Sequence, residues 1–253
     1  MSALLETRSV SKFYGAFRAL DDVSITLNAG ELVSVVGPNG AGKTTLVNLL
    51  TGLIAPTSGD VLFKGKSIAG VGPVQLADHG VARTFQLIQI FPQLTVSETI
   101  AAAVVSRQRK RWHLFSALSA DRESSARVRE VAKIFSLGHR LDTAAAILSQ
   151  GEKKLLDVAS AFALDPQVIL LDEPTSGVST ADKHGIMKTL VEAGKAAGVQ
   201  GILLVEHDMD LVAAYSDRII ALSEGQVLAN LPTADFFADP QLIEAVIGKR
   251  RGH

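Results

Sequence analysis

We expect this chain of 253 residues to form an α/β fold with a parallel sheet at its core. Apolar runs of strand length recur along the chain, and helical sequence separates them. The clearest runs are residues 31–36, 168–171, 201–205 and 218–222. Strands that alternate with helices favour a parallel sheet, because the helices then serve as crossovers. A long helical stretch from about residue 95 to 148 interrupts the alternation and predicts a helical insertion.

Shorter strands are expected before and after the first core strand. Residues 7–10 and 23–27 are strand-like, and Asn28 to Gly30 has the composition of a turn. Residues 61–63 and the glycine-containing segment 64–67 suggest one arm of a hairpin and its turn. These segments predict an antiparallel β subdomain in addition to the parallel core.

Composition limits the classes of protein to consider. Hydrophobic residues make up 47% of the chain and charged residues 20%, which is enough for a sizeable core. The formal net charge of −1 gives no reason to expect a nucleic-acid partner. No apolar run approaches the roughly 18 residues of a membrane span, and the first residues do not resemble a secretory signal. The sequence contains no cysteine, which excludes disulfides, and we expect a soluble cytoplasmic protein.

A glycine-rich segment after the first core strand predicts a phosphate-binding loop. The pattern Gly-x-x-x-x-Gly-Lys-Thr consists of Gly37, Pro38, Asn39, Gly40, Ala41, Gly42, Lys43 and Thr44. Glycines let the backbone curl until successive N–H groups face phosphate oxygens, and the helix that follows adds its own attraction for anions. Lys43 is expected to place its charge against the outer phosphates of a nucleotide, and the Thr44 hydroxyl is expected to bind Mg²⁺.

Two later strands also end in polar residues. Asp172 and Glu173 follow the run 168–171. A carboxylate there can hold Mg²⁺ through water, and its neighbour can polarise a water for attack on the γ-phosphate, so we assign Asp172 to the metal and Glu173 to the base. His207 follows the run 201–205 and is expected to hydrogen-bond the γ-phosphate. The alternative for the two acids is a turn with a helix-capping carboxylate.

Ser149, Gln150 and Gly151 precede a strongly helical run. A helix N-terminus favours anions, so Ser149 and the Gly151 backbone are candidates for contact with a phosphate. The alternative is structural: Ser149 is an N-cap and Glu152 completes a capping box. The two interpretations are compatible, because a helix N-terminus left open to a neighbour has the same sequence.

Gln86 and Tyr14 are weaker candidates. Gln86 follows a strand-like segment and opens the helical stretch, where it is expected to contact the γ-phosphate or Mg²⁺; a solvent-facing glutamine is the alternative. Tyr14 lies before the phosphate loop, where its ring can stack on adenine for roughly 1–3 kcal/mol. Phe13 and Phe17 compete for that role.

In this order, the motifs resemble those of the ATP-binding subunits of ATP-binding cassette (ABC) transporters, over nearly the whole chain. The matching residues are Tyr14 for adenine, Gly37–Thr45 for the phosphate loop with Thr45 as its last residue, Gln86 for the Q-loop, Leu148–Glu152 for the signature, Asp172 and Glu173 for the metal site and base, and His207 for the switch histidine. The resemblance implies a P-loop NTPase (RecA-like) fold in a single domain, residues 1–253. Residues 1–89 and 161–253 would form the nucleotide-binding core with its antiparallel β subdomain, and residues 90–160 the inserted α-helical subdomain.

The resemblance also implies cofactors and partners. Such subunits bind ATP and Mg²⁺ and associate head-to-tail in pairs, so that the phosphate loop of each faces the signature helix of the other. Ser149, Gln150 and Gly151 would then contact ATP held by the partner, as an oxyanion site does. The other partners implied are integral membrane permease subunits on separate chains, which places this subunit on the inner face of the cell membrane.

Four finer features of the sequence resemble those of ATPase subunits in uptake systems for branched-chain amino acids and related amides. They are residues 82–86, residues 90–96, the long insertion before the signature, and residues 205–212. Those importers use two different ATPase subunits, which implies a heterodimer. The basic segment Arg107 to Arg111 faces either lipid or a membrane subunit, or is a solvated helix face.

The chain departs from the family pattern at two places. Gln150 and Glu152 stand where the commonest signature has glycine and glutamine, a place where relatives vary. Ser179 stands where many relatives carry the aspartate of a loop that bridges the two subunits, which puts its contacts across the dimer in question.

Two other classes of function remain as alternatives. A soluble ABC ATPase of DNA repair or translation would add long coiled coils or a second cassette, and this chain has neither. A nucleotide-binding regulator without turnover would not need Glu173 and His207. Among importers, branched-chain amino acids, urea, short amides and aromatic acids all remain open as solutes.

Overall fold

The computed structural model describes residues 3–84, 91–107 and 122–247, which fall into two compact units. The first unit combines residues 1–79 with residues 200–253, and the second consists of residues 80–199. Within the described residues, none of the helices has the length and apolar character that a membrane crossing requires.

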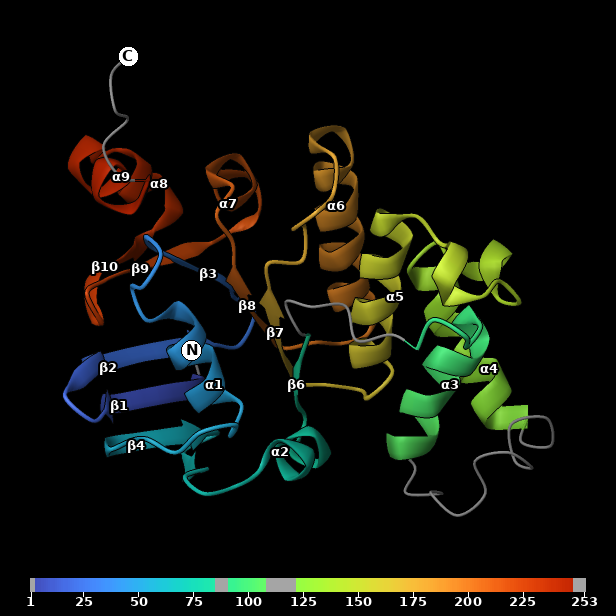
Figure 1. Ribbon diagram of the computed structural model, residues 1–253, viewed down its shortest axis with the longest axis horizontal. Coiled ribbons are helices and arrows are strands. Elements are labelled where there is room, and N and C mark those ends of the chain that lie inside the picture. The colour runs from blue at the N-terminus through green and yellow to red at the C-terminus, as the bar shows by residue number, and fades with distance from the viewer. Residues whose placement is uncertain (1–2, 85–90, 108–121, 248–253) are drawn as a thin grey trace. The chain divides into compact units, whose positions relative to one another are not determined.

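The first unit contains an antiparallel sheet with strand order β2-β1-β4-β5 (Figure 1). Its strands are β1 (Ala3–Tyr14), β2 (Phe17–Asn28), β4 (Ser58–Phe63) and β5 (Lys66–Ser67). The predicted hairpin near residue 63 is confirmed, but β1 and β2 extend well beyond residues 7–10 and 23–27. Bulges explain the difference, because the register shifts around Ser9 in the pairings of β1 with both β2 and β4, and the φ of 45° at Ser9 breaks the alternation of inward and outward side chains.

A second sheet in this unit has β3 (Leu32–Val36) between its parallel neighbours β8 (Gly201–Val205) and β9 (Arg218–Ser223). All five residues of β3 are buried, as expected for a parallel strand covered on both faces. The sequence did not indicate β10 (Gln226–Pro232), which pairs antiparallel with β9. The two strands are joined at Glu224 and Gly225, which have φ of 49° and 79°, a pair of positive values typical of a tight hairpin turn.

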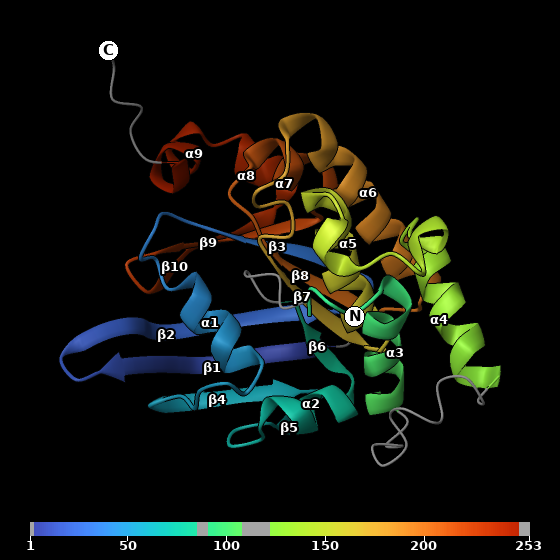
Figure 2. The same cartoon turned by 45° about the vertical axis from the view of Figure 1, so that its right-hand side comes forward.

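Helices of the first unit follow its strands. They are α1 (Lys43–Leu50), α2 (Pro73–His79), α7 (Met209–Tyr215), α8 (Thr233–Phe237) and α9 (Pro240–Ile247). Figure 1 shows α8 and α9 beside β9 and β10, and Figure 2 shows α1 beside the antiparallel sheet. Val36 of β3, Ile219 of β9, Val212 of α7 and Phe236 of α8 share one buried cluster, which fixes the strand that leads into the phosphate loop.

The second unit holds the parallel strand pair β6 (Val81–Arg83) and β7 (Val168–Asp172) and a group of helices. The helices are α3 (Val96–Arg107), α4 (Arg122–Ile134), α5 (Gln150–Phe162) and α6 (Thr180–Ala196), with short 3-10 turns η2 (Gly138–Arg140) and η3 (Ala145–Ile147). Figure 2 shows α3, α4, α5 and α6 side by side, and Phe135 meets Phe162 edge-to-face with ring centroids 5.1 Å apart.

Helix α3 begins at Val96, within the helical stretch predicted from about residue 95. Thr95 caps the helix: its Oγ1 accepts from the N–H of Glu98 at 3.2 Å, and the Glu98 carboxylate accepts from the N–H of Thr95 at 2.8 Å. Threonine before the helix and glutamate three residues later form a capping box, which satisfies N–H groups that have no helical partner.

Candidate nucleotide-binding site

The phosphate-binding loop lies in the first unit between β3 and α1. Gly37, Gly40 and Gly42 all have positive φ, and α1 begins at Lys43. A Cβ on Gly37 would lie 2.2 Å from the carbonyl oxygen of Leu222, and one on Gly42 would lie 2.7 Å from that of Ala19. Glycine is therefore required at both positions by backbone conformation and by space.

Lys43 is the charged group of this loop. Its side chain is buried, and its Nζ donates to the carbonyl oxygens of Gly37 at 2.7 Å and Pro38 at 2.9 Å. Within Lys43–Leu50, no acidic residue occupies the first turn, and the N-cap Gly42 has no side chain to cap it. The positive end of the helix and the lysine charge therefore converge on the loop.

Thr44 and Thr45 occupy the first turn of α1. Thr44 is exposed and Thr45 is half-buried. The Thr44 hydroxyl is thus accessible at the helix N-terminus, as the predicted ligation of Mg²⁺ requires.

Strand β8 brings His207 to the same edge of the sheet as the loop. Val205 lies beside Val35 in parallel register, so β3 and β8 end together, and His207 is exposed just beyond. The intervening Glu206 is buried, and its carboxylate accepts from the backbone N–H of His207 at 2.9 Å. Sequence reasoning missed Glu206, although a charged residue directly after a buried strand was a visible signal.

Tyr14 ends β1 with about half of its surface exposed. The ammonium of Lys12 lies 5.3 Å from the centre of its ring. Phe13 and Phe17 are also exposed, and Arg18 lies against the Phe13 ring. Since all three aromatic residues are accessible, the choice of Tyr14 for adenine stays a prediction.

The two acids lie in the second unit at the end of β7. The carboxylate of Asp172 is 3% exposed, and its Oδ2 accepts from Nη2 of Arg83 at 2.7 Å. Glu173 is half-buried with φ of 48°, a left-handed conformation uncommon outside glycine. Its carbonyl oxygen accepts from Nζ of Lys154 at 3.3 Å. The Arg83 contact was not predicted.

The capping box predicted at Ser149 is confirmed. Ser149 Oγ accepts from the N–H of Glu152 at 3.2 Å, and the Glu152 carboxylate accepts from the N–H of Ser149 at 2.8 Å. This backbone contact lowers the pKa of Glu152, and Arg140 adds to the effect. Ser149 and Gln150 are exposed and Gly151 is half-buried, so the cap leaves the serine hydroxyl accessible to another molecule.

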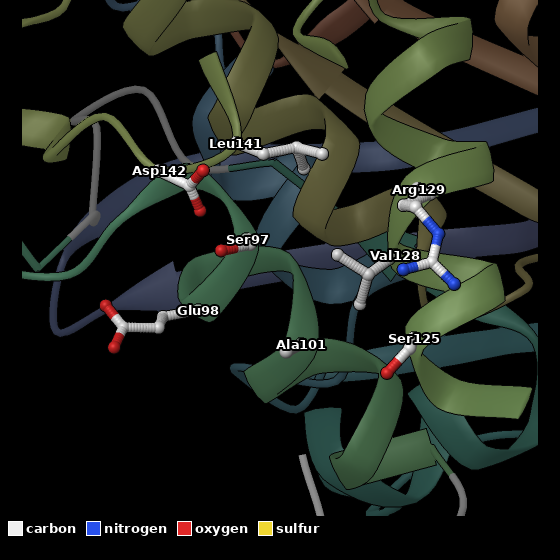
Figure 3. Close-up of a pocket in the computed structure, with 8 residues that line it drawn as sticks. All are labelled: Ser97, Glu98, Ala101, Ser125, Val128, Arg129, Leu141 and Asp142. Atoms are coloured by element: carbon white, nitrogen blue, oxygen red, sulfur yellow. The ribbon is translucent and has the colours of Figure 1, made fainter. Parts of the chain in front are cut away.

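Gln86 lies outside the described residues, as does the basic segment after Arg107. A pocket of about 250 Å³ opens between α3 and α4 of the second unit, lined in part by Ala101, Val128 and Asp142 (Figure 3). Among the predicted site residues that the structure describes, none lines this pocket.

An unexpected group on α5 gives a testable pH effect. Burial raises the pKa of Asp157 from 3.8 to about 6, and Lys154 offsets only part of this rise. An acid whose pKa is higher in the folded state binds its proton more tightly there, so its contribution to stability falls as pH rises from about 4 to 6. The ionised carboxylate should cost roughly 3 kcal/mol at pH 7.

Asp157→Asn should therefore raise the free energy of unfolding by about 1–3 kcal/mol at pH 7.5 and leave it nearly unchanged near pH 4. Urea unfolding of both proteins at several pH values measures the difference. Asp142→Asn, at an exposed aspartate, is the control and should show no such trend. An Asp157→Asn effect independent of pH would contradict the shifted pKa.

Known proteins of the ABC transporter family are similar to this chain over nearly its full length. Residues 20–176 match the family model described as ABC transporter. The probable branched-chain amino acid transport ATP-binding protein LivG of Archaeoglobus fulgidus is 34% identical over 97% of this chain and 95% of its own length.

The solved structures that this chain resembles are also ATP-binding cassettes of ABC transporters. An ATP-binding cassette of an ABC transporter in its ADP conformation has a TM-score of 0.85 at 30% identity, covering 98% of this chain and 100% of that one. A dimeric ATP-binding cassette in a post-hydrolysis state with ADP and phosphate has a TM-score of 0.76 at 26% identity, covering 91% and 99% of the two chains. The α/β fold predicted from the sequence is thereby confirmed, and the chain belongs to the ABC transporter family as one of its ATP-hydrolysing cassettes.

Proposed function

We propose that this chain is the energy-coupling ATPase of an importer for branched-chain amino acids or closely related solutes. The observation that carries the proposal is the loop from Gly37 to Gly42, whose glycines have positive φ and whose Lys43 is buried with its charge against the loop. The name of the archaeal relative supports the solute class.

ATP is proposed to bind through its phosphates to the backbone of residues 37–45 and to Lys43, with adenine stacked on Tyr14. Loop N–H groups, the helix N-terminus and the lysine each favour an anion, so their effects add at the β- and γ-phosphates. The exposure of Tyr14 is consistent with a stacking role.

The residues present fit Mg²⁺. Thr44 offers a hydroxyl, Asp172 a carboxylate and Gln86 an amide oxygen, which are the hard oxygen donors that this ion prefers. When bound, Mg²⁺ offsets the negative charge of the β- and γ-phosphates.

For hydrolysis, we assign Glu173 as the group that accepts a proton from the attacking water. The water oxygen bonds to the γ-phosphorus as the bond from that phosphorus to ADP breaks. His207 is proposed to donate a hydrogen bond to the γ-phosphate, and Gln86 to help orient the water. The bond from Lys154 to the carbonyl of Glu173 supports this assignment, because it fixes the backbone that carries the base.

Complete sites are proposed to form between two cassettes arranged head-to-tail, as a heterodimer with a related ATPase subunit. Ser149, Gln150 and Gly151 would then cap the γ-phosphate of ATP bound by the partner. The exposure of Ser149 and Gln150 supports this, and so does the dimeric relative. Ser179, at the start of α6, donates to Asp182 at 2.6 Å, a contact within its own chain.

Membrane permease subunits are the other proposed partners, and the cassette would lie on the inner face of the cell membrane. Residues 1–89 and 161–253 are proposed as the nucleotide-binding core, and residues 90–160 as the helical subdomain that meets the permease.

Transport in reconstituted vesicles tests this function. The complex would be assembled from this chain, the related ATPase subunit, and the permease and solute-binding proteins encoded beside it. With ATP on the cassette side, we expect uptake of radiolabelled leucine, isoleucine or valine, and none with Lys43→Ala. Uptake of urea, an amide or an aromatic acid alone would overturn the solute class. A chain that joined no membrane complex would overturn the transport role and favour a soluble ATPase.

A further inference from the structure

A buried ion pair joins the end of β6 to the end of β7. The side chain of Arg83 is 9% exposed and that of Asp172 is 3% exposed, and Nη2 of the arginine lies 2.7 Å from Oδ2 of the aspartate. The strands are parallel neighbours with Arg83 opposite Leu170, so the guanidinium reaches two residues further along β7. Thr84 adds to the connection, because its N–H donates to the carbonyl of Leu170 at 3.0 Å.

Stability alone gives a weak reason for this pair. Removing two charges from water costs several kcal/mol per ion, and apolar residues of similar volume are often as stable or more so. The rest of β7 consists of buried valine, isoleucine and leucine, so an apolar pair would suit the surroundings. Arginine, with its planar fork, is also the cation that best fixes the orientation of a carboxylate.

We infer that Arg83 is a positioning residue of the ATPase: it orients the Asp172 carboxylate through Oδ2 and lowers the attraction of that carboxylate for Mg²⁺. This rests on the proposed metal role of Asp172. Asp172, oriented in this way, would hold Mg²⁺ through water. Because the guanidinium already offsets part of the Asp172 charge, it would weaken the attraction of that carboxylate for a second cation.

Loss of Arg83 therefore has two opposite effects. The metal is held more tightly, because the aspartate charge is no longer shared with a guanidinium. Turnover falls, because the carboxylate is no longer fixed in the orientation that the reaction needs. If Arg83 were purely structural, its loss would lower thermal stability without changing the contribution of Mg²⁺ to nucleotide affinity.

The metal contribution is measured without turnover, as the ratio of two dissociation constants for a fluorescent ATP analogue. The constant determined in EDTA is divided by the constant determined in excess Mg²⁺, so a larger ratio means that Mg²⁺ contributes more to binding. We expect this ratio to rise about 3- to 10-fold in Arg83→Met relative to the unmodified protein, with a drop in kcat of about tenfold. Arg127→Met, which removes another arginine paired with an aspartate, is the matched control and should leave the ratio unchanged.

Two further variants distinguish an error in the metal role of Asp172 from an error in the role of Arg83. Asp172→Asn should bring the ratio close to one; if it does not, the proposed metal role of Asp172 is wrong. If Asp172→Asn collapses the ratio but Arg83→Met leaves it unchanged, the inference about Arg83 is wrong. Arg83→Lys keeps the charge but not the fork, and it serves if Arg83→Met does not fold. It should hold the ratio within twofold and still lower kcat, and a normal kcat would overturn the orienting role.

Discussion

Steady-state ATP hydrolysis should fall by at least about 100-fold in Glu173→Gln, while ATP affinity stays within a few-fold of the unmodified protein. Glutamine has the shape of glutamate but cannot accept the proton of the attacking water. The backbone at this position is held by Lys154 and has a left-handed φ of 48°, so an isosteric change should not move it. ATP-bound dimers should accumulate, because the step that releases them no longer occurs.

Phosphate release and size-exclusion chromatography in Mg²⁺ and ATP measure these two outcomes. Glu130→Gln, at an exposed glutamate of α4, is a matched control and should retain activity. Normal turnover by Glu173→Gln would remove Glu173 from the role of base.

Lys43→Ala should lower ATP affinity by at least about 10-fold, since a hydrogen bond to a charged group is worth roughly 1.5–3 kcal/mol. The lysine is buried and donates to the carbonyls of Gly37 and Pro38, so its removal also leaves the loop less well fixed. Alanine therefore removes both the charge and the preorganisation of the phosphate site.

Calorimetric titration with ATP gives the affinity. Lys188→Ala, at a side chain that is 70% exposed, should bind ATP normally. Unchanged affinity in Lys43→Ala would mean that the phosphates bind elsewhere.

Local sequence determined the features that were predicted well. The sharp turn of residues 37–42 was predicted because glycine is the residue that tolerates the backbone of Gly37 and Gly42, and the capping box because Ser149 and Glu152 are three residues apart. Strands β7, β8 and β9 were found because their residues are almost entirely apolar and buried.

The features that were missed depend on pairing across the fold. The bulge at Ser9 hid the length of β1, and the turn before β10 uses Glu224 and Gly225 in place of the more recognisable Asn-Gly. The partner of Asp172 is Arg83, which lies 89 residues away, and nothing in the strand-like segment around it indicated an ion pair.

ATP held by one cassette should be capped by the signature helix of another. Cryo-electron microscopy of the Glu173→Gln complex with Mg²⁺ and ATP tests it most directly. We expect Ser149 to lie within hydrogen-bonding distance of a γ-phosphate whose nucleotide is bound by the phosphate loop of the other subunit. A Ser149 that contacts no nucleotide, or only one bound by its own chain, would contradict it.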